Sequence, residues 1–110
     1  MGPLKDIKVI EFSGIGPGPY CGMLLADMGA EVIRVSKKGT EGLENKFDIH
    51  NRSKRSITAD LKNASTVTEI LKLIDQVDVV IEGFRPGVME KLGLGPDICI
   101  ERNPKLVYGR

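Results

Sequence analysis

The chain has 110 residues, enough for one hydrophobic core and too few for two independent domains. Its formal net charge of +1 gives no overall field that attracts nucleic acid or an anionic membrane, so an anion site requires a local cluster of charge. No apolar run approaches the roughly 20 residues of a membrane-spanning helix, and the amino terminus lacks the apolar core of a signal peptide. We therefore expect a cytoplasmic protein that binds neither nucleic acid nor membrane.

The first third of the chain has the pattern of a β-α-β unit. Residues 7–12 predict a strand that ends at a turn dense in glycine and proline. A helical period begins at Tyr20, with prolines at the helix entrance and Gly29 as the stop signal. A second strand is expected at residues 31–35, so that one helix joins two parallel strands.

Residues 36–56 have little apolar periodicity and many lysines and arginines, which predicts a long surface loop. A loop of this length in a compact domain is usually functional. His50, the chain's one histidine, lies in this loop without an evident carboxylate partner, so we expect it to be solvated.

The pattern then returns to short alternating elements. After a brief extended stretch at 57–61, the Thr-x-x-Glu spacing of residues 66–69 predicts a capping box that starts a helix. The apolar density of residues 77–81 suits a strand at the buried centre of a parallel sheet. Short helices are expected from Pro86 to Leu92 and from Pro96 to about Arg102, before a last strand that begins at 106. The apolar stripe of the expected capped helix consists of Val67, Ile70, Leu71 and Ile74.

This alternation predicts an α/β fold, a Rossmann-like doubly wound parallel sheet. Residues 1–110 would be its N-terminal part, incomplete because nothing follows to cover the last strand. Cys21 and Cys99 are far apart and form no Cys-x-x-Cys pair, so we expect two small buried apolar residues rather than a disulfide or a metal site. No residues have metal-ligand spacing, and no metal is expected.

Ligands of such sheets bind beyond the carboxyl ends of the strands, and three features of the sequence fall there or follow a strand. The glycine-rich turn 13–19 does not fit the G-x-G-x-x-G spacing, and lysines stand where a dinucleotide site needs Asp or Glu for the ribose. A phosphate suits this pattern better than NAD does, and a tight turn without a ligand is the alternative.

The second feature is a basic group, which can hold a polyphosphate or can be a solvated face. No aromatic residues interleave it to stack nucleic-acid bases. The third is the turn 82–87, where Phe84 can stack on an adenine and Arg85 can hold a phosphate. The alternative is that Phe84 belongs to the core and Arg85 to the surface. The basic group consists of Lys37, Lys38, Lys46, Arg52, Lys54, Arg55 and Lys62.

Catalytic residues are not evident, because no nucleophile stands in a recognisable pairing with a base. The residues considered were Glu11, Ser13, Cys21, Asp27 and Glu82. The residues alone therefore predict a phosphate-bearing ligand and no visible catalyst.

The chain also carries a family pattern along nearly its whole length, in residues 3–11, 14–19, 25–35, 51–56, 59–62, 81–90 and 103–108. These stretches resemble the class III CoA-transferases and α-methylacyl-CoA racemases. The Gly-Ile-Gly-Pro-Gly-Pro turn at 14–19 and the stretch 85–96 look more like the racemase branch.

The resemblance implies a Rossmann-like domain that binds CoA thioesters, in subunits that form interlocked homodimers. CoA is part of the substrate, so no separate cofactor is implied. The family more often has Arg at the position of Lys37, and lysine keeps the charge without the bidentate fork. The contacts implied for the CoA portion map to Lys37, Ala59, Asp60, Leu61, Lys62, Gly83, Phe84, Arg85 and Lys91.

The activity implied is racemisation at the α-carbon of 2-methylacyl-CoA thioesters in fatty-acid metabolism. A histidine and a carboxylate act as acid and base, and the thioester carbonyl carries the enolate charge. In the family this pair lies beyond the position of Arg110, so we expect residues 1–110 alone to bind CoA weakly at most and to be inactive. The alternatives are a class III CoA-transferase that moves CoA between carboxylic acids through an aspartate nucleophile, and a non-catalytic nucleotide- or CoA-binding module.

Overall fold

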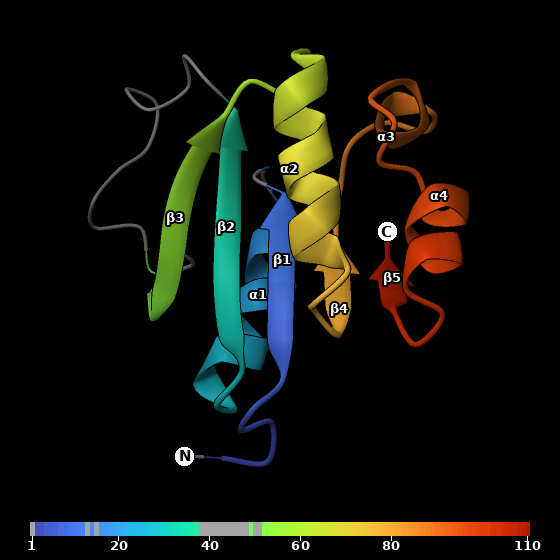
Figure 1. Cartoon of the computed structure of the whole chain (residues 1–110). Helices are drawn as coiled ribbons and strands as arrows, with labels where there is room; N and C mark the ends of the chain where they lie inside the picture. The colour runs from blue at the N-terminus through green and yellow to red at the C-terminus, as the bar shows by residue number, and fades with distance from the viewer. Residues whose placement is uncertain (1, 13, 15, 38–48, 50–51) are drawn as a thin grey trace.

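The structure is a computed structural model that describes residues 2–12, 14, 16–37, 49 and 52–110, with the backbone alone at Lys37. Five strands of this part form one parallel sheet in the order β3-β2-β1-β4-β5, with helices on both faces (Figure 1). This confirms the predicted doubly wound α/β fold. The elements are β1 (Lys8–Phe12), α1 (Pro17–Asp27), β2 (Glu31–Lys37), β3 (Lys54–Ala59), α2 (Ala64–Ile74), β4 (Val79–Ile81), α3 (Val88–Lys91), α4 (Pro96–Arg102) and β5 (Val107–Gly109).

Strand β1 occupies the centre of the sheet. Ile10 aligns with Ile33 of β2 on one side and with Val80 of β4 on the other. Residues 77–81, whose apolar density suits the buried centre of the sheet, contain β4, an interior strand between β1 and β5, while the middle position belongs to β1. Both strands are apolar, so composition alone does not separate them.

Two apolar clusters hold the layers together. The larger lies between the sheet and the helices α2 and α4, and it contains the fully buried Phe12, Ile74 and Met89. The smaller lies under α1, around Val9 and Val32. In Figure 1, α1 covers the back of the sheet and α2 the front. Within the described residues, no helix is long and apolar enough to cross a membrane.

The loop predicted at 36–56 is shorter at both ends than expected. Ser36 belongs to β2, and β3 begins at Lys54, before the extended stretch predicted from residue 57. The reason is that β3 is an edge strand whose side chains are mostly exposed. Backbone pairing with β2 holds such a strand, so its sequence needs no apolar alternation.

Helix α2 begins earlier than the predicted capping box. Its N-cap is Asn63, whose side-chain oxygen accepts hydrogen bonds from the backbone N–H groups of Ser65 at 2.9 Å and Thr66 at 3.2 Å. Asparagine is among the strongest N-caps, and the helix therefore starts there rather than at Thr66. The predicted apolar stripe is confirmed: its four members Val67, Ile70, Leu71 and Ile74 pack into the larger core cluster.

The last helices agree with the sequence pattern in part: α3 begins at Val88 rather than at the predicted Pro86, because Gly87 has a left-handed φ of 86°. Helix α4 has the predicted bounds, and the predicted stop of α3 is confirmed by Gly93, which has a φ of 78°. Cys99 is fully buried, as expected, and burial raises the pKa of its thiol to about 11. Cys21 is exposed on α1, so its predicted burial is wrong. The helical stripe that faces the sheet contains Met23 instead.

Candidate ligand site

A pocket of about 390 Å³ opens where the first turn of α2 approaches α3. Both helices follow the carboxyl ends of sheet strands, the edge at which ligands of parallel sheets bind. Two exposed lysines and several aliphatic residues line the pocket. The lining residues are Leu61, Lys62, Ala64, Val67, Lys91 and Leu92. The structure thus brings together three predicted contact residues, Leu61, Lys62 and Lys91, from separate parts of the sequence.

A tight turn after β3 shapes one wall of this pocket. The Asp60 side chain accepts the backbone N–H of Lys62 at 3.1 Å, and the Asp60 carbonyl accepts that of Asn63 at 3.1 Å. Leu61 points into the core at 5% exposure, whereas Asp60 and Lys62 are exposed. The turn therefore buries one predicted residue as the wall and presents the next as a cation. Ala59, the last residue of β3, is buried.

The predicted residues Gly83, Phe84 and Arg85 lie on the neighbouring loop after β4. They are not among the lining residues of the pocket. Phe84 is half-buried and packs against the larger core cluster, which agrees with the core alternative, while Gly83 and Arg85 are exposed. The backbone N–H of Phe84 donates to Glu82 at 2.9 Å, which fixes the start of the loop.

Lys37 is the last residue of β2, and its backbone aligns with that of Ala59. This register places it at the same carboxyl edge as the pocket. The other basic residues expected nearby, Lys38 and Lys46, lie outside the described residues, as does His50.

Three members of the predicted basic group lie at the opposite edge of the sheet. Lys54 aligns with Val32, near the start of β2, so Arg52, Lys54 and Arg55 gather at the amino edge. Arg52 donates to Asp27 at 3.1 Å, and these hydrogen bonds lower the pKa of the Asp27 carboxyl. The idea of one continuous phosphate-binding group is therefore wrong. Lys54 is the first residue of β3 and Lys62 follows the end of β3, so the two lysines lie at opposite edges of the sheet.

Lys54 forms a buried ion pair that the sequence does not reveal. Its Nζ lies 2.6 Å from Oε1 of Glu11 on β1, and both side chains are fully buried. The same Nζ donates to the carbonyl of Pro19 in the first turn of α1 at 3.0 Å. Gly22 covers the pair, because a Cβ there would lie 1.8 Å from Glu11 Oε1. The pair joins β3 to β1 and α1 without contributing a charge to the pocket.

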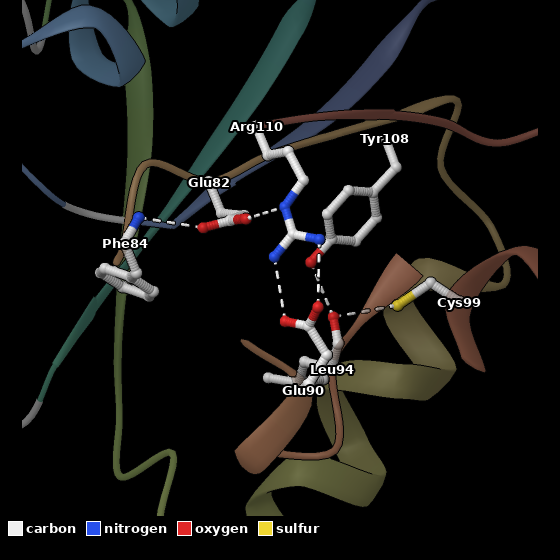
Figure 2. A network of polar contacts seen from close by, with 7 residues as sticks. All are labelled: Glu82, Phe84, Glu90, Leu94, Cys99, Tyr108 and Arg110. Carbon is white, nitrogen blue, oxygen red and sulfur yellow. Dashed lines mark hydrogen bonds and ion pairs between the residues drawn. The ribbon is translucent and has the colours of Figure 1, made fainter. Parts of the chain in front are cut away.

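A second network links the loop after β4 to the end of β5 (Figure 2). Glu82, whose side chain is 1% exposed, accepts a hydrogen bond from Arg110 Nε at 2.9 Å. The two terminal nitrogens of Arg110 donate to the two carboxylate oxygens of Glu90 at 3.1 and 2.9 Å. These hydrogen bonds lower the pKa of Glu90 and raise that of Arg110, so the ion pair stays charged near neutral pH. Sequence inspection singled out Glu82 but not its partner, 28 positions away.

Beside this network, the backbone carbonyl of Leu94 accepts two side-chain hydrogen bonds. Leu94 O accepts the Tyr108 hydroxyl at 2.8 Å and the Cys99 thiol at 3.5 Å (Figure 2). Burial raises the pKa of Tyr108, so its hydroxyl remains a donor. The guanidinium carbon of Arg110 lies 5.8 Å from the centre of the Tyr108 ring. The end of β5 is thereby fixed to the segment between α3 and α4.

Comparisons with known proteins agree with this architecture. The family model of the CoA-transferase family III matches residues 4–110. The chain is 49% identical, over 107 residues, to the alpha-methylacyl-CoA racemase of Mus musculus, covering 97% of this chain and 27% of that protein. It is 43% identical to the probable fatty acyl-CoA transferase Rv3272 of Mycobacterium tuberculosis, covering 98% of this chain and 31% of that protein.

A crystal structure of the Mycobacterium tuberculosis protein Rv3272 superposes with a TM-score of 0.91 at 44% identity. It covers 98% of this chain and 31% of the solved chain, so the present chain spans about a third of that relative or less. The match of the family model over nearly the whole chain, together with these identities, shows that the chain belongs to the CoA-transferase family III.

Proposed function

We propose that the chain is the coenzyme-A-binding part of an α-methylacyl-CoA racemase-like enzyme. The observation that carries this proposal is the pocket that Lys62 and Lys91 line together with aliphatic residues, among them Leu61, Val67 and Leu92. Aliphatic walls suit the faces of an adenine, and two ammonium groups suit phosphates. CoA offers both chemistries in one molecule.

The other predicted contacts extend the proposed site along the same edge of the sheet. Lys37 ends β2, Ala59 and Asp60 lead into the pocket, and the exposed loop 83–85 follows β4. Arg85 can add a bidentate phosphate contact, and the partly exposed ring of Phe84 can cover a flat ligand. We propose no separate cofactor, because the acyl group and CoA form one substrate.

For the whole protein we propose exchange of the α-proton of a 2-methylacyl-CoA, in a homodimer. The 49% identity to a mammalian racemase supports this reaction over transfer. The 43% identity to a probable fatty acyl-CoA transferase keeps transfer of CoA between carboxylic acids as the second candidate. Incubation in deuterium oxide separates the two: racemisation places deuterium on the α-carbon, and transfer does not. Residues 1–110 alone are expected to do neither. Deuterium incorporation by residues 1–110 alone would contradict the assignment of catalysis to groups outside this chain.

Replacement of either pocket lysine by glutamine is expected to weaken CoA binding about tenfold, since a charged hydrogen bond to phosphate contributes roughly 1.5 kcal/mol. The variants are Lys62→Gln and Lys91→Gln, with Lys105→Gln as a control at an exposed turn position away from the pocket lining. Affinity can be measured by following backbone amide shifts during a CoA titration. An equal loss in the Lys105 variant would mean that CoA responds to overall charge, and would remove the pocket from the proposal.

A further inference from the structure

The segment that carries Lys91 is a single helical turn, closed by backbone hydrogen bonds such as the one from the Lys91 N–H to the Gly87 carbonyl at 3.1 Å. Helix α3 has four residues, Val88–Lys91, and it follows a turn in which Gly87 has a φ of 86°. Met89 anchors its inner side in the core. Its outer side carries the exposed Glu90 and Lys91. In the loop 83–85 that precedes it, Gly83 and Arg85 are exposed and Phe84 packs against the core.

Arg110 reaches both of these segments from the end of β5. Its Nε donates to Glu82, at the start of the loop, and its two terminal nitrogens donate to Glu90 on α3 (Figure 2). One planar guanidinium thus joins three carboxylate oxygens, a geometry that an ammonium cannot reproduce. Gly95 leaves room for the Glu90 side chain, because a Cβ at position 95 would lie 3.0 Å from Glu90 Cγ.

We propose that Arg110 is a positioning residue for the ligand pocket. Arg110 holds the loop after β4 through Glu82 and holds helix α3 through Glu90. The inference rests on the proposed function, because the pocket ligand is taken to be CoA. Arg110 is absent from the lining of the pocket, so its effect on a ligand passes through Lys91 and the loop 83–85.

The effect on the loop follows from the burial of Glu82. A carboxylate whose side chain is 1% exposed needs a cation or strong donors to remain there. Its other oxygen accepts the backbone N–H of Phe84. Without Arg110, Glu82 gains hydration by rotating towards water, and the N–H of Phe84 then loses its acceptor. The loop 83–85 would lose the bond that fixes its first turn.

The effect on Lys91 follows from the fork on Glu90. Two parallel hydrogen bonds hold Glu90, the residue directly before Lys91, and they add to the buried Met89 and the backbone hydrogen bonds in fixing α3. Without the fork, Met89 still anchors the helix, but the direction of Lys91 is less constrained. The ammonium would then spend less time over the pocket, and the affinity for an anion would fall.

A matched control exists in the same chain. Arg102 on α4 donates to both oxygens of Asp75 at 2.9 and 2.7 Å, with 37% of each side chain exposed. This pair is a similar bidentate contact, and neither residue lines the pocket. Arg102→Gln therefore reports what the loss of an arginine fork does to stability alone.

The test compares Arg110→Gln, Arg110→Lys and Arg102→Gln in the 110-residue chain, well below their thermal midpoints. We expect Arg110→Gln to raise the Kd for CoA about tenfold, Arg102→Gln to change it less than about twofold, and Arg110→Lys to lie between. Without ligand, hydrogen exchange of the Phe84 amide should be about tenfold faster in Arg110→Gln than in Arg102→Gln. Lysine restores one ion pair but not the fork.

Each outcome decides the matter. Equal losses of affinity in the Arg110 and Arg102 variants would reduce Arg110 to a stabilising residue. Full rescue by Arg110→Lys would contradict the role of the fork. If the wild-type chain fails to bind CoA, the proposed function fails, and the exchange of Phe84 decides the positioning role separately: an unchanged rate overturns it, and a faster rate in Arg110→Gln alone supports it.

Discussion

Replacement of Lys54 by methionine is expected to lower the free energy of unfolding by about 3–5 kcal/mol, the usual cost of removing one partner of a buried ion pair. Lys54 and Glu11 are fully buried at 2.6 Å, so the variant leaves the Glu11 carboxylate without its ammonium partner. The loss also frees the start of β3, an edge strand with mostly exposed side chains. Urea unfolding followed by circular dichroism measures the change.

Arg55→Met is the matched control, because Arg55 lies beside Lys54 on β3 and forms an exposed pair at 3.4 Å with Glu31 of β2. Exposed pairs contribute about 0–1 kcal/mol, so little change is expected. The double variant Glu11→Gln, Lys54→Met should be more stable than Lys54→Met, since the buried carboxylate that lost its ammonium partner is then replaced by an uncharged amide. A loss below about 1 kcal/mol in Lys54→Met would contradict the burial of the pair.

Gly22→Ala is expected to destabilise the chain by about 3 kcal/mol, the upper end of the usual cost of overpacking. The new Cβ would lie 1.8 Å from Glu11 Oε1 and 3.1 Å from Lys54 Nζ. A side-chain end can ordinarily move away, but this carboxylate is fully buried and held by the ion pair. Relief of the clash therefore requires a shift of α1 or a rupture of the pair.

Gly18→Ala gives the opposite expectation on the same helix. Nothing described lies within 4 Å of a Cβ at Gly18. Alanine in a helix is favoured over glycine by about 0.5–1 kcal/mol, so this variant should be neutral or stabilised. Thermal unfolding of both variants tests the contrast. Equal behaviour of the two variants would mean that α1 does not press on the ion pair.

The sequence predicts elements well where burial imposes a period. The stripe of α2 and the bounds of α4 follow from apolar spacing and from proline and glycine signals. The first half of strand β3, before residue 57, escaped prediction because an exposed edge strand is fixed by backbone pairing rather than by apolar side chains. The N-cap of α2 was misplaced because Asn63 and Thr66 both have capping chemistry and lie three positions apart.

The candidate site also contains residues that the sequence predicts and contacts that it does not reveal. The family pattern pointed to Leu61, Lys62 and Lys91, and the fold brings them to one pocket. The basic group failed as a unit because charge in a sequence does not show which end of a strand a residue occupies. Lys54 is buried with Glu11, while Lys62 follows the same strand at its other end. The network of Glu82 and Arg110 joins residues that only the parallel register brings into contact.

The most direct test of the account is a calorimetric titration of the wild-type chain with CoA, dephospho-CoA and NAD. The account predicts weak but saturable binding of CoA, weaker binding when the 3′-phosphate is missing, and no binding of NAD. In the proposed site Lys62 and Lys91, which line the pocket, would provide the charges that recognise phosphate, and the turn after β1 lacks the dinucleotide spacing. Equal binding of all three ligands would contradict the assignment of the pocket to CoA, and no binding of CoA by a folded chain would contradict a CoA site formed by residues 1–110 alone.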